Sequence, residues 1–473
     1  MNRSVGLRFN LEVGMNQNVR TTSELLNLAS ERAIRYLNEI GNRAVAPSIE
    51  SIERLSEMGG PLPKDPSDPA EVIHALDEIG SPATMATAGP RYFGFVVGGA
   101  MPVAVAANWL AGAWDQNAPV SLLSPIGTAC ERISIGWLVE LFGLPRGTWG
   151  GLVTGATTAN FTGLAAARQA ILHRQGWDVS AKGLFGAPKI RVVVGEEVHV
   201  SVLLALRVLG FGREDLIRVP TDGQGRMRVD ALPDLDENTI VCMQAGNVNS
   251  GAFDPAEEIC RRAQKAGSWT HVDGAFGLWA VAAPEHKNLT TGIAKADSWA
   301  TDAHKWLNVP YDCGIVLCRE PQNLAMVMSL DPAAYIEEAM GAGEPGNFTL
   351  EMSRRARGVE VWAALRTLGR SGLAELIERT CRHARVFSQR LAETGFEILN
   401  DVVLNQVLVS FGDDGETRRV LAKVQEEGTC WVSGTNWHGR QAMRISVSSW
   451  VTTSEDVDRS VEAIVRVASK GSN

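Results

Sequence analysis

The sequence predicts an α/β protein built on a mostly parallel sheet that helices cover on both faces. Short apolar runs rich in β-branched residues alternate with helix-like segments between residues 189 and 318, a pattern typical of buried parallel strands. The predicted strands are 190–194, 239–243, 269–272, 298–301 and 314–317. Polar residues follow several of these strands directly, and such sheets place their active sites at the carboxyl ends of the strands.

The chain divides into three predicted domains. Residues 1–85 carry an amphipathic helix at 22–42 and a proline-rich linker, too little for an independent core, so we expect this segment to pack on a partner subunit. Residues 86–375 form the large domain. Residues 376–473 form a small C-terminal α+β domain, with strands at 397–399, 406–410, 430–433 and 443–447 between the helices 417–427 and 454–468.

Composition and charge limit the possible functions. The 473 residues are 45% hydrophobic and carry a net charge of −9, which argues against nucleic acid as a partner. Seven cysteines without a C-x-x-C pair indicate reduced core residues in a cytoplasmic protein, and no metal site is predicted. The uncharged stretch 92–114 is long enough to span a membrane, but its Gly, Ala, Pro102 and Asn108 favour a buried wall or a subunit interface.

An aspartate and a lysine follow two neighbouring predicted strands. Asp273 ends one strand, and Lys305 lies 32 residues later, in an apolar frame with Trp306 and Leu307 behind it. A desolvated lysine amine is a good nucleophile towards an aldehyde, and a buried carboxylate stabilises a protonated ring nitrogen. This pair predicts a site for pyridoxal 5′-phosphate (PLP). Either residue alone has an ordinary structural explanation, as a packed lysine stem or a turn-capping aspartate.

Three further segments fit such a site. Residues 151–160, rich in Gly and Thr, open a helix, and a helix start binds phosphate well, although Thr157 or Thr158 could simply cap the helix. His199 ends another predicted strand, where its ring could stack on a cofactor. Asn247, after the strand 239–243, could contact the cofactor as well.

Several motifs in this order resemble the group II pyridoxal-phosphate-dependent amino-acid decarboxylases, the family of aromatic-amino-acid, histidine and glutamate decarboxylases. The resemblance covers roughly residues 50 to 465. The matching pieces are residues 91–95, 154–160, His199, 245–255, His271-Val272-Asp273-Gly274-Ala275, Asp302-Ala303-His304-Lys305-Trp306 and 353–357.

The resemblance implies a fold of the aspartate-aminotransferase type (PLP fold type I), with a mixed, mostly parallel seven-stranded sheet, in a homodimer whose active sites lie at the interface. It also implies residue roles. Lys305 is expected to bind the cofactor covalently and Asp273 to hold its ring nitrogen, while Ala275 packs beneath the ring and His199 stacks above it. The remaining expected contacts are Ala156 and Thr157 at the phosphate, His304 and Asp302 near the cofactor, and Asn247, where many relatives have threonine.

The expected reaction is decarboxylation of an L-amino acid to the amine and carbon dioxide. In this family a loop tyrosine is held to return a proton to Cα; Phe348 stands near that place in this chain, and Tyr335 is the alternative. Relatives in which phenylalanine replaces the tyrosine are aldehyde synthases, so an aldehyde synthase is the second hypothesis. A PLP aminotransferase is a third. Arg444 could clamp a substrate carboxylate as in fold relatives that transaminate, but a structural role is preferred. A catalytically silent partner protein is not expected while Lys305 and Asp273 are present.

The identity of the amino acid is left open by the sequence. Aromatic and aliphatic residues could form a wall for an aromatic side chain, while Gln116 and Asn117 could serve a polar one. The candidate wall residues are Tyr92, Phe93, Val96, Val97, Trp109 and Trp114.

Overall fold

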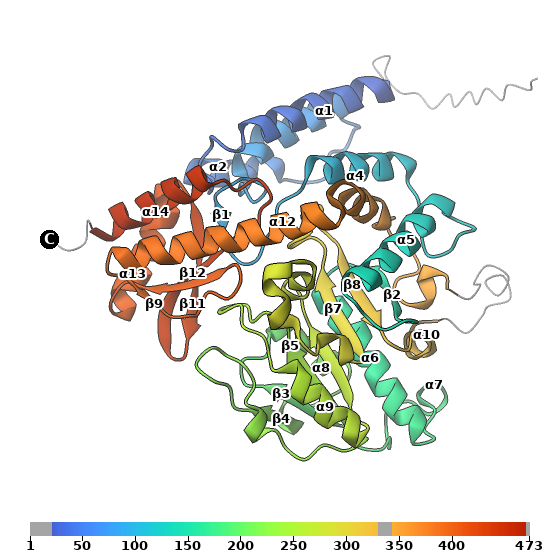
Figure 1. Cartoon of the computed structure of the whole chain (residues 1–473). Helices are drawn as coiled ribbons and strands as arrows, with labels where there is room; N and C mark the ends of the chain where they lie inside the picture. The colour runs from blue at the N-terminus through green and yellow to red at the C-terminus, as the bar shows by residue number, and fades with distance from the viewer. Residues whose placement is uncertain (1–20, 330–342, 470–473) are drawn as a thin grey trace, which may run out of the picture. The chain divides into compact units, whose positions relative to one another are not determined.

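The computed structural model describes residues 21–329 and 343–469 (Figure 1). The described residues up to Ala86 form one compact unit, and those from Thr87 onward form a second unit that contains both β-sheets.

The first unit is helical. Its longest helix, α1, begins after Thr21, whose side chain and that of Glu24 cap each other's backbone N–H groups in a capping box. This helix buries none of its residues, and Leu26 and Ile34 are 59% and 51% exposed. The α-helices of this unit are α1 (Thr22–Glu39), α2 (Ile49–Glu53) and α3 (Pro69–Ala75), and the short helical turns are η1 (Arg54–Met58), η2 (Leu76–Gly80) and η3 (Ser81–Ala83).

The second unit contains a seven-stranded sheet with the strand order β2-β8-β7-β6-β5-β3-β4. Strand β8 runs antiparallel to both of its neighbours, and the pairs β7–β6, β6–β5, β5–β3 and β3–β4 are parallel. The strands are β2 (Trp149–Val153), β3 (Arg191–Gly195), β4 (Leu216–Val219), β5 (Thr239–Gln244), β6 (Trp269–Asp273), β7 (Ser298–Asp302) and β8 (Gly314–Cys318). The predicted mixed, mostly parallel sheet is therefore confirmed.

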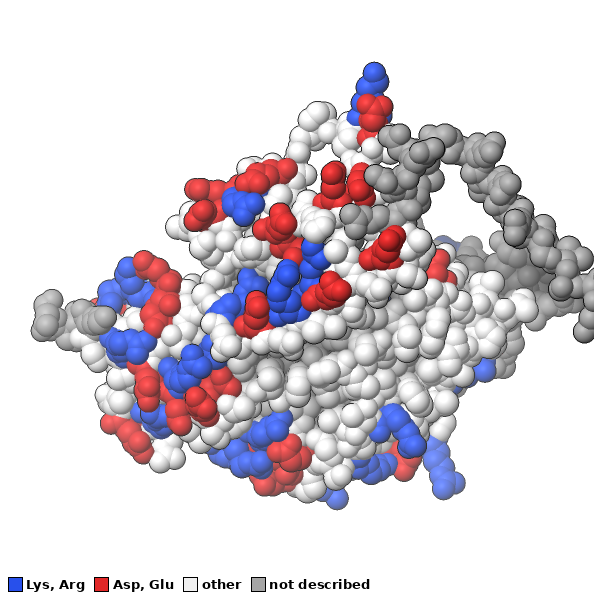
Figure 2. All heavy atoms as spheres, turned by 90° about the horizontal axis from the view of Figure 1, so that it is seen from above, with Lys and Arg blue, Asp and Glu red and all other residues white. Residues whose placement is uncertain are grey.

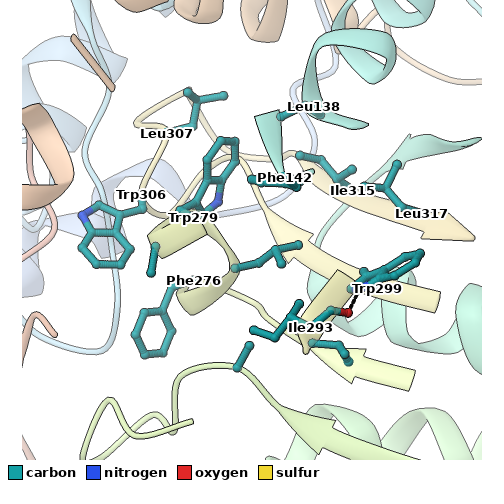
Figure 3. Packing of buried hydrophobic residues seen from close by; sticks show 14 of the residues in the cluster. Leu138, Phe142, Phe276, Trp279, Ile293, Trp299, Trp306, Leu307, Ile315 and Leu317 are labelled. Atoms are coloured by element: carbon teal, nitrogen blue, oxygen red, sulfur yellow. Dashed lines mark hydrogen bonds between the residues drawn. The ribbon is translucent and has the colours of Figure 1, made fainter. Parts of the chain in front are cut away.

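Successive residues of each strand point into two different hydrophobic cores, as the two-residue period of a strand requires. In β8, Ile315 and Leu317 belong to one core and Val316 and Cys318 to the other. The first core lies under α5 (Pro125–Leu141), α9 (Ala256–Ala266) and α12 (Gly358–Glu393), and the second under α6 (Ala156–Arg174), α8 (Val200–Val208) and α10 (Gln322–Met328). Figure 3 shows the first core, where the Trp299 indole N–H donates to the carbonyl of Ile293 at 2.9 Å.

A smaller, five-stranded sheet has the order β1-β11-β12-β10-β9. Its first strand comes from far upstream: Tyr92 and Phe93 pair in parallel with Trp431 and Val432, and the Tyr92 and Trp431 rings stack with centroids 5.1 Å apart. The strands are β1 (Tyr92–Phe93), β9 (Glu397–Ile398), β10 (Gln406–Ser410), β11 (Trp431–Trp437) and β12 (Arg440–Ser446), and α13 (Asp414–Glu427) and α14 (Ser454–Ser469) pack on them.

The remaining elements are short connections, apart from α4 (Pro102–Trp114). They are α7 (Val179–Lys182) and the 3₁₀ turns η4 (Arg213–Asp215), η5 (Val229–Ala231), η6 (Gly277–Ala282), η7 (Pro284–Thr290), η8 (Ile293–Lys295) and η9 (Pro345–Asn347). The uncharged stretch 92–114 thus forms β1 and α4. Ala104 and Ala107 of α4 are buried, but Trp109 and Trp114 are each 43% exposed.

Two other expectations concern the surface and the cysteines. All seven cysteines are buried and unpaired. Among the described residues, no helix is long and apolar enough to cross a membrane. Figure 2 shows one face of the molecule, on which acidic and basic side chains lie interspersed.

Candidate active site

Three polar side chains meet in the turn that follows β7. Asp302 ends the strand, and its carboxylate lies 3.0 Å from Lys305 Nζ and 3.5 Å from His304 Nε2. His304 Nδ1 accepts a hydrogen bond from the backbone N–H of Cys313 at 3.0 Å, which leaves Nε2 to face the carboxylate. Burial lowers the pKa of His304, although the charge of Asp302 opposes that shift.

The backbone around Lys305 is held from several directions. A Cβ atom on Gly98 would lie 1.5 Å from the Lys305 carbonyl oxygen, so only glycine permits this approach. The buried Trp306 indole donates to Thr380 Oγ1 at 3.0 Å, and the amide of Asn308 donates to the carbonyls of Trp306 and Ser448. The amine of Lys305 therefore stands on a rigid support.

The start of α6 approaches the same turn. The backbone N–H of Ala156 donates to Asp302 Oδ1 at 2.6 Å, so this carboxylate accepts from the amino end of the helix. The adjoining Gly155 is packed closely, because a Cβ on Gly314 would lie 2.5 Å from its backbone. Thr157, the second residue of α6, is exposed, and Thr158 exchanges a 2.8 Å hydrogen bond with Thr154.

Asp273 ends β6, beside β7, and its side chain is almost completely buried. Among the described residues, its carboxylate accepts one hydrogen bond, from the Ala275 N–H at 3.2 Å, and has no ion-pair partner within 4 Å. Burial raises the pKa of Asp273, while His199 and Lys305 act in the opposite direction. A cation placed against Asp273 would offset the cost of burying its charge. The Ala275 carbonyl accepts from the Asp302 N–H at 2.9 Å.

His199 occupies the N-cap position of α8. Its Nδ1 accepts from the Ser201 backbone N–H at 3.3 Å and lies 2.8 Å from Ser201 Oγ. Burial lowers the pKa of His199, Asp273 opposes this shift, and Lys305 and Arg444 add to it. His199 is therefore within electrostatic range of both strand-end residues.

The side chain of Asn247 stabilises the turn that follows β5. Its side-chain oxygen accepts from the backbone N–H groups of Asn249 and Ser250 and so closes its own turn. Its Nδ2 atom is buried and has no hydrogen-bond partner among the described residues, and a Cβ on Gly225 would lie 3.1 Å from it. A contact between Asn247 and a cofactor stays a prediction.

Arg444 is a buried arginine without an ion-pair partner among the described residues, which the sequence did not predict. It is 7% exposed, its Nη1 donates to Asn249 Oδ1 at 3.0 Å, and no carboxylate in the described chain lies within ion-pair distance of it. Burial lowers the pKa of Arg444 to about 10. A lone arginine in a strand gives no sequence signal of this isolation, which arises from the pairing of β12 with its neighbours.

Phe348 lies in the second core rather than over the strand ends. Its side chain is 6% exposed and packs with the cluster that includes Leu324 and Met328. Tyr335, the alternative proton donor, lies outside the described residues. Gln116 and Asn117, the candidates for contact with a polar substrate side chain, make hydrogen bonds within the chain: Asn117 Oδ1 accepts from the Arg354 N–H, and Gln116 donates to the Trp114 carbonyl.

These residues fit PLP in three respects. The amino end of α6 already bonds an anionic group, the carboxylate of Asp302, in place of a phosphate. The buried carboxylate of Asp273 has no ion-pair partner within 4 Å among the described residues, and the side chain of Lys305 is 20% exposed. A phosphate, a cationic ring nitrogen and an aldehyde would match these three groups respectively.

Comparison with known proteins gives a consistent result. The conserved domain of pyridoxal-dependent decarboxylases matches residues 58–412. An aromatic-L-amino-acid decarboxylase of Bacillus atrophaeus is 27% identical over 471 residues, covering 94% of this chain and 95% of that protein. A phenylacetaldehyde synthase of Arabidopsis thaliana is 26% identical over 374 residues, covering 73% and 75% of the two chains. The crystal structure of Oryza sativa TDC with PLP and tryptamine shares the fold, with a TM-score of 0.86 at 22% identity over 97% of this chain and 100% of that chain.

Proposed function

Because the chain belongs to the pyridoxal-dependent decarboxylase family, we propose that it converts an L-amino acid to the corresponding amine and carbon dioxide. Its cofactor is pyridoxal 5′-phosphate. The observation that supports the proposed site most strongly is the convergence of Lys305, Asp273 and His199 at the carboxyl edge of the large sheet.

Each predicted site residue has a proposed role. Lys305 would hold the cofactor through Nζ, and Asp273 would sustain a positive charge on its ring nitrogen. The backbone of Ala156 would receive the phosphate at the start of α6. The remaining proposed contacts are Thr157 and His304 at the phosphate side, Ala275 and His199 on opposite ring faces, and Asn247.

Bound there, the cofactor supplies an aldehyde that condenses with amines and a ring that accepts the electron pair left by the departing carboxylate. The chain's own groups complete this chemistry. The Asp273 carboxylate, in a low-dielectric site, stabilises positive charge opposite the reacting carbon far better than water would. Lys305 Nζ, 3.0 Å from the Asp302 carboxylate, would hold the cofactor.

A second candidate is an aldehyde synthase, and a relative of that kind favours keeping it. Phe348 was the sequence feature behind this hypothesis, but its place in the second core gives it no evident access to the reacting carbon. We therefore propose the amine as the product, and Tyr335 stays a predicted proton donor. None of the three relatives described above is named as an aminotransferase.

The test is incubation of the purified protein, loaded with PLP, with single amino acids. Amine with carbon dioxide supports the proposal; aldehyde, ammonia and peroxide support the second candidate, and a keto acid would contradict both. Lys305→Ala should lose the visible absorbance of tightly bound cofactor while keeping its fold. The matched control is Lys295→Ala, which removes an exposed lysine paired with Glu257 and should change neither property.

We also propose that two copies of the chain form a dimer and that the site is completed at their interface. Large apolar side chains are exposed near α4: Leu122 is 77% exposed, Leu123 55% and Trp109 43%. Exposed apolar side chains of this size favour an interaction surface. Leu122→Asp should shift the sedimentation coefficient from dimer to monomer, and an unchanged value would contradict this surface. The unpaired cysteines support a cytoplasmic location.

A further inference from the structure

A continuous line of hydrogen bonds runs through the protein beneath the site and ends on His199. It begins at the indole of Trp269, at the start of β6, and passes between the large sheet and the helices α6 and α8. All of its members before His199 are at least nine-tenths buried, and they are Trp269, Ser298, His271, Asn160 and Ser201. We call this line the β6–α8 relay.

The links of the relay are short. Trp269 Nε1 lies 3.0 Å from Ser298 Oγ, which lies 2.8 Å from His271 Nδ1. His271 Nε2 lies 2.9 Å from Asn160 Oδ1, and Asn160 Nδ2 lies 3.3 Å from Ser201 Oγ. The last link, from Ser201 Oγ to His199 Nδ1, is 2.8 Å long. Five consecutive hydrogen bonds thus connect Trp269, where β6 begins, with His199, which follows the carboxyl end of β3.

The direction of donation follows from the His199 end. The backbone N–H of Ser201 can only donate, and it points to His199 Nδ1, so this nitrogen is an acceptor. The Ser201 hydroxyl must then donate to Nδ1 as well, and its oxygen accepts from the Asn160 amide. The oxygen of Asn160 is left for His271 Nε2, which must donate to it.

The Trp269 end gives the same direction independently. An indole N–H is donor only, so Ser298 Oγ accepts from Trp269 and its hydrogen is available for His271 Nδ1. A neutral imidazole has one donor and one acceptor, which is what His271 needs in the relay. Burial lowers the pKa of His271 to about 3, so the ring is neutral near pH 7. If Asn160 were turned over, the Ser201 hydroxyl would face its oxygen and could no longer serve His199.

We infer that the β6–α8 relay holds His199 as the neutral tautomer with its proton on Nε2. The positioning residues are then Ser201, Asn160 and His271. Nε2 is the ring nitrogen without a partner among the described residues, so His199 offers the site a hydrogen-bond donor and not a base. The charged groups that act on His199 are Asp273, Asp302, Lys305 and Arg444. A catalytic role for the Nε2–H donor of His199 rests on the proposed function, whereas the tautomer of His199 is independent of that function.

The tautomer can be measured without cofactor or substrate. The full chain is labelled with ¹⁵N-histidine, and His199→Gln identifies the signals of His199 in long-range ¹H–¹⁵N spectra. A protonated Nε2 and an unprotonated Nδ1 are expected near pH 7. A proton on Nδ1, or rapid exchange between the two forms, would overturn the inference even if the protein proves to be a decarboxylase.

Asn160→Asp tests the direction of the relay. An ionised aspartate can only accept, so the Ser201 hydroxyl should turn to residue 160 and leave the Ser201 backbone N–H as the remaining donor to His199 Nδ1, which should shift the His199 Nδ1 signal. The control is Asn405→Asp, which also introduces a carboxylate at a fully buried asparagine, one bonded to Val447 and Ser448 in the small domain. It should keep the wild-type His199 pattern.

Trp269→Phe removes only the indole N–H that donates to Ser298. Because it introduces no charge, it provides a second test if Asn160→Asp does not fold. It should broaden or shift the His271 signals, whereas Trp299→Phe, which removes an indole bonded to Ile293 in the other core, should not. In the PLP-loaded enzyme, Asn160→Asp should lower kcat roughly tenfold, the value of about one hydrogen bond. Unchanged His199 and His271 spectra in both relay variants would refute the relay.

Discussion

The carboxylate of Asp302 lies 3.0 Å from the amine of Lys305, which is three residues further along the chain. The same carboxylate accepts the Ala156 N–H at the start of α6 at 2.6 Å. The negatively charged Asp302 side chain therefore contacts both groups that are proposed to bind PLP: the Lys305 amine, for the aldehyde, and the Ala156 N–H, for the phosphate.

Asp302→Asn should tighten the binding of PLP and of inorganic phosphate to the cofactor-free protein. Removing a charge from the amino end of a helix relieves repulsion worth about 1 kcal/mol, or roughly fivefold in affinity. Changes in intrinsic fluorescence during titration measure both affinities. The control is Asp297→Asn, which changes the residue directly before the start of β7 and should leave both affinities unchanged. Weaker phosphate binding in Asp302→Asn would mean that Asp302 assists the phosphate site.

Glu131→Gln should cost about 3 kcal/mol in the free energy of unfolding, because it leaves a buried guanidinium unpaired. Both side chains of the Glu131–Arg354 pair are at most 2% exposed, and Arg354 Nη2 lies 2.8 Å from the carboxylate and 2.7 Å from the Leu152 carbonyl. Urea unfolding measures the change. The control, Glu140→Gln, breaks the exposed Glu140–Arg370 pair and should cost less than about 0.5 kcal/mol.

Replacement of His271 should reduce the loss of stability in acid. The folded pKa of His271 is about 3, below the value of about 6.5 for an unfolded histidine, so the unfolded chain binds the extra proton between these values. The contribution of His271 to stability is complete above pH 6.5 and falls by about 1.4 kcal/mol for each pH unit below it. His271→Gln keeps a donor and an acceptor but cannot titrate. Urea unfolding between pH 7 and 5 should show a shallower decline for this variant, and parallel curves would contradict the assigned pKa.

Substitutions at the two candidate positions of the proton donor, residues 335 and 348, should separate amine from aldehyde formation. Tyr335→Phe is expected to divert product from amine towards aldehyde, because the Cα proton donor is lost. Phe348→Tyr should leave the product ratio unchanged, since residue 348 is buried in the second core. Chromatography of amine and aldehyde, with a peroxide assay, measures the ratio. A product change in Phe348→Tyr alone would restore Phe348 as the deciding residue.

The sequence predicted the strands that carry the site, because they are continuous apolar runs closed by a polar residue. Asp273 and Lys305 were predicted as site residues in this way. Asp273 ends β6 and Lys305 follows β7, and these two strands are adjacent and parallel. The segment 151–160, predicted to open a helix, begins inside strand β2 at the second of the two glycines Gly150 and Gly151. In the sheet these glycines permit close packing: a Cβ on Gly150 would lie 1.8 Å from the Val316 carbonyl oxygen.

Other features depend on contacts between distant segments and leave no local pattern. Phe348 looked like a loop residue because Gly346 and Asn347 precede it, yet its ring is drawn into the core beneath α6. The roles of Asn160 and Ser201 arise only when α6 and α8 pack against β6 and bring His271 between them. The isolation of Arg444 likewise becomes visible only once its neighbours in space are known.

The pairing of β1 with β11 has a consequence for synthesis of the chain. Phe95 and Ser433, joined by a hydrogen bond next to this pairing, are 338 residues apart. The ribosome therefore releases β1 long before its partner strand exists, and this edge of the small sheet forms only after β11 has been synthesised. A nascent chain stalled before residue 431 should leave Tyr92 accessible to chemical labelling, and the chain of residues 1–473 should protect it.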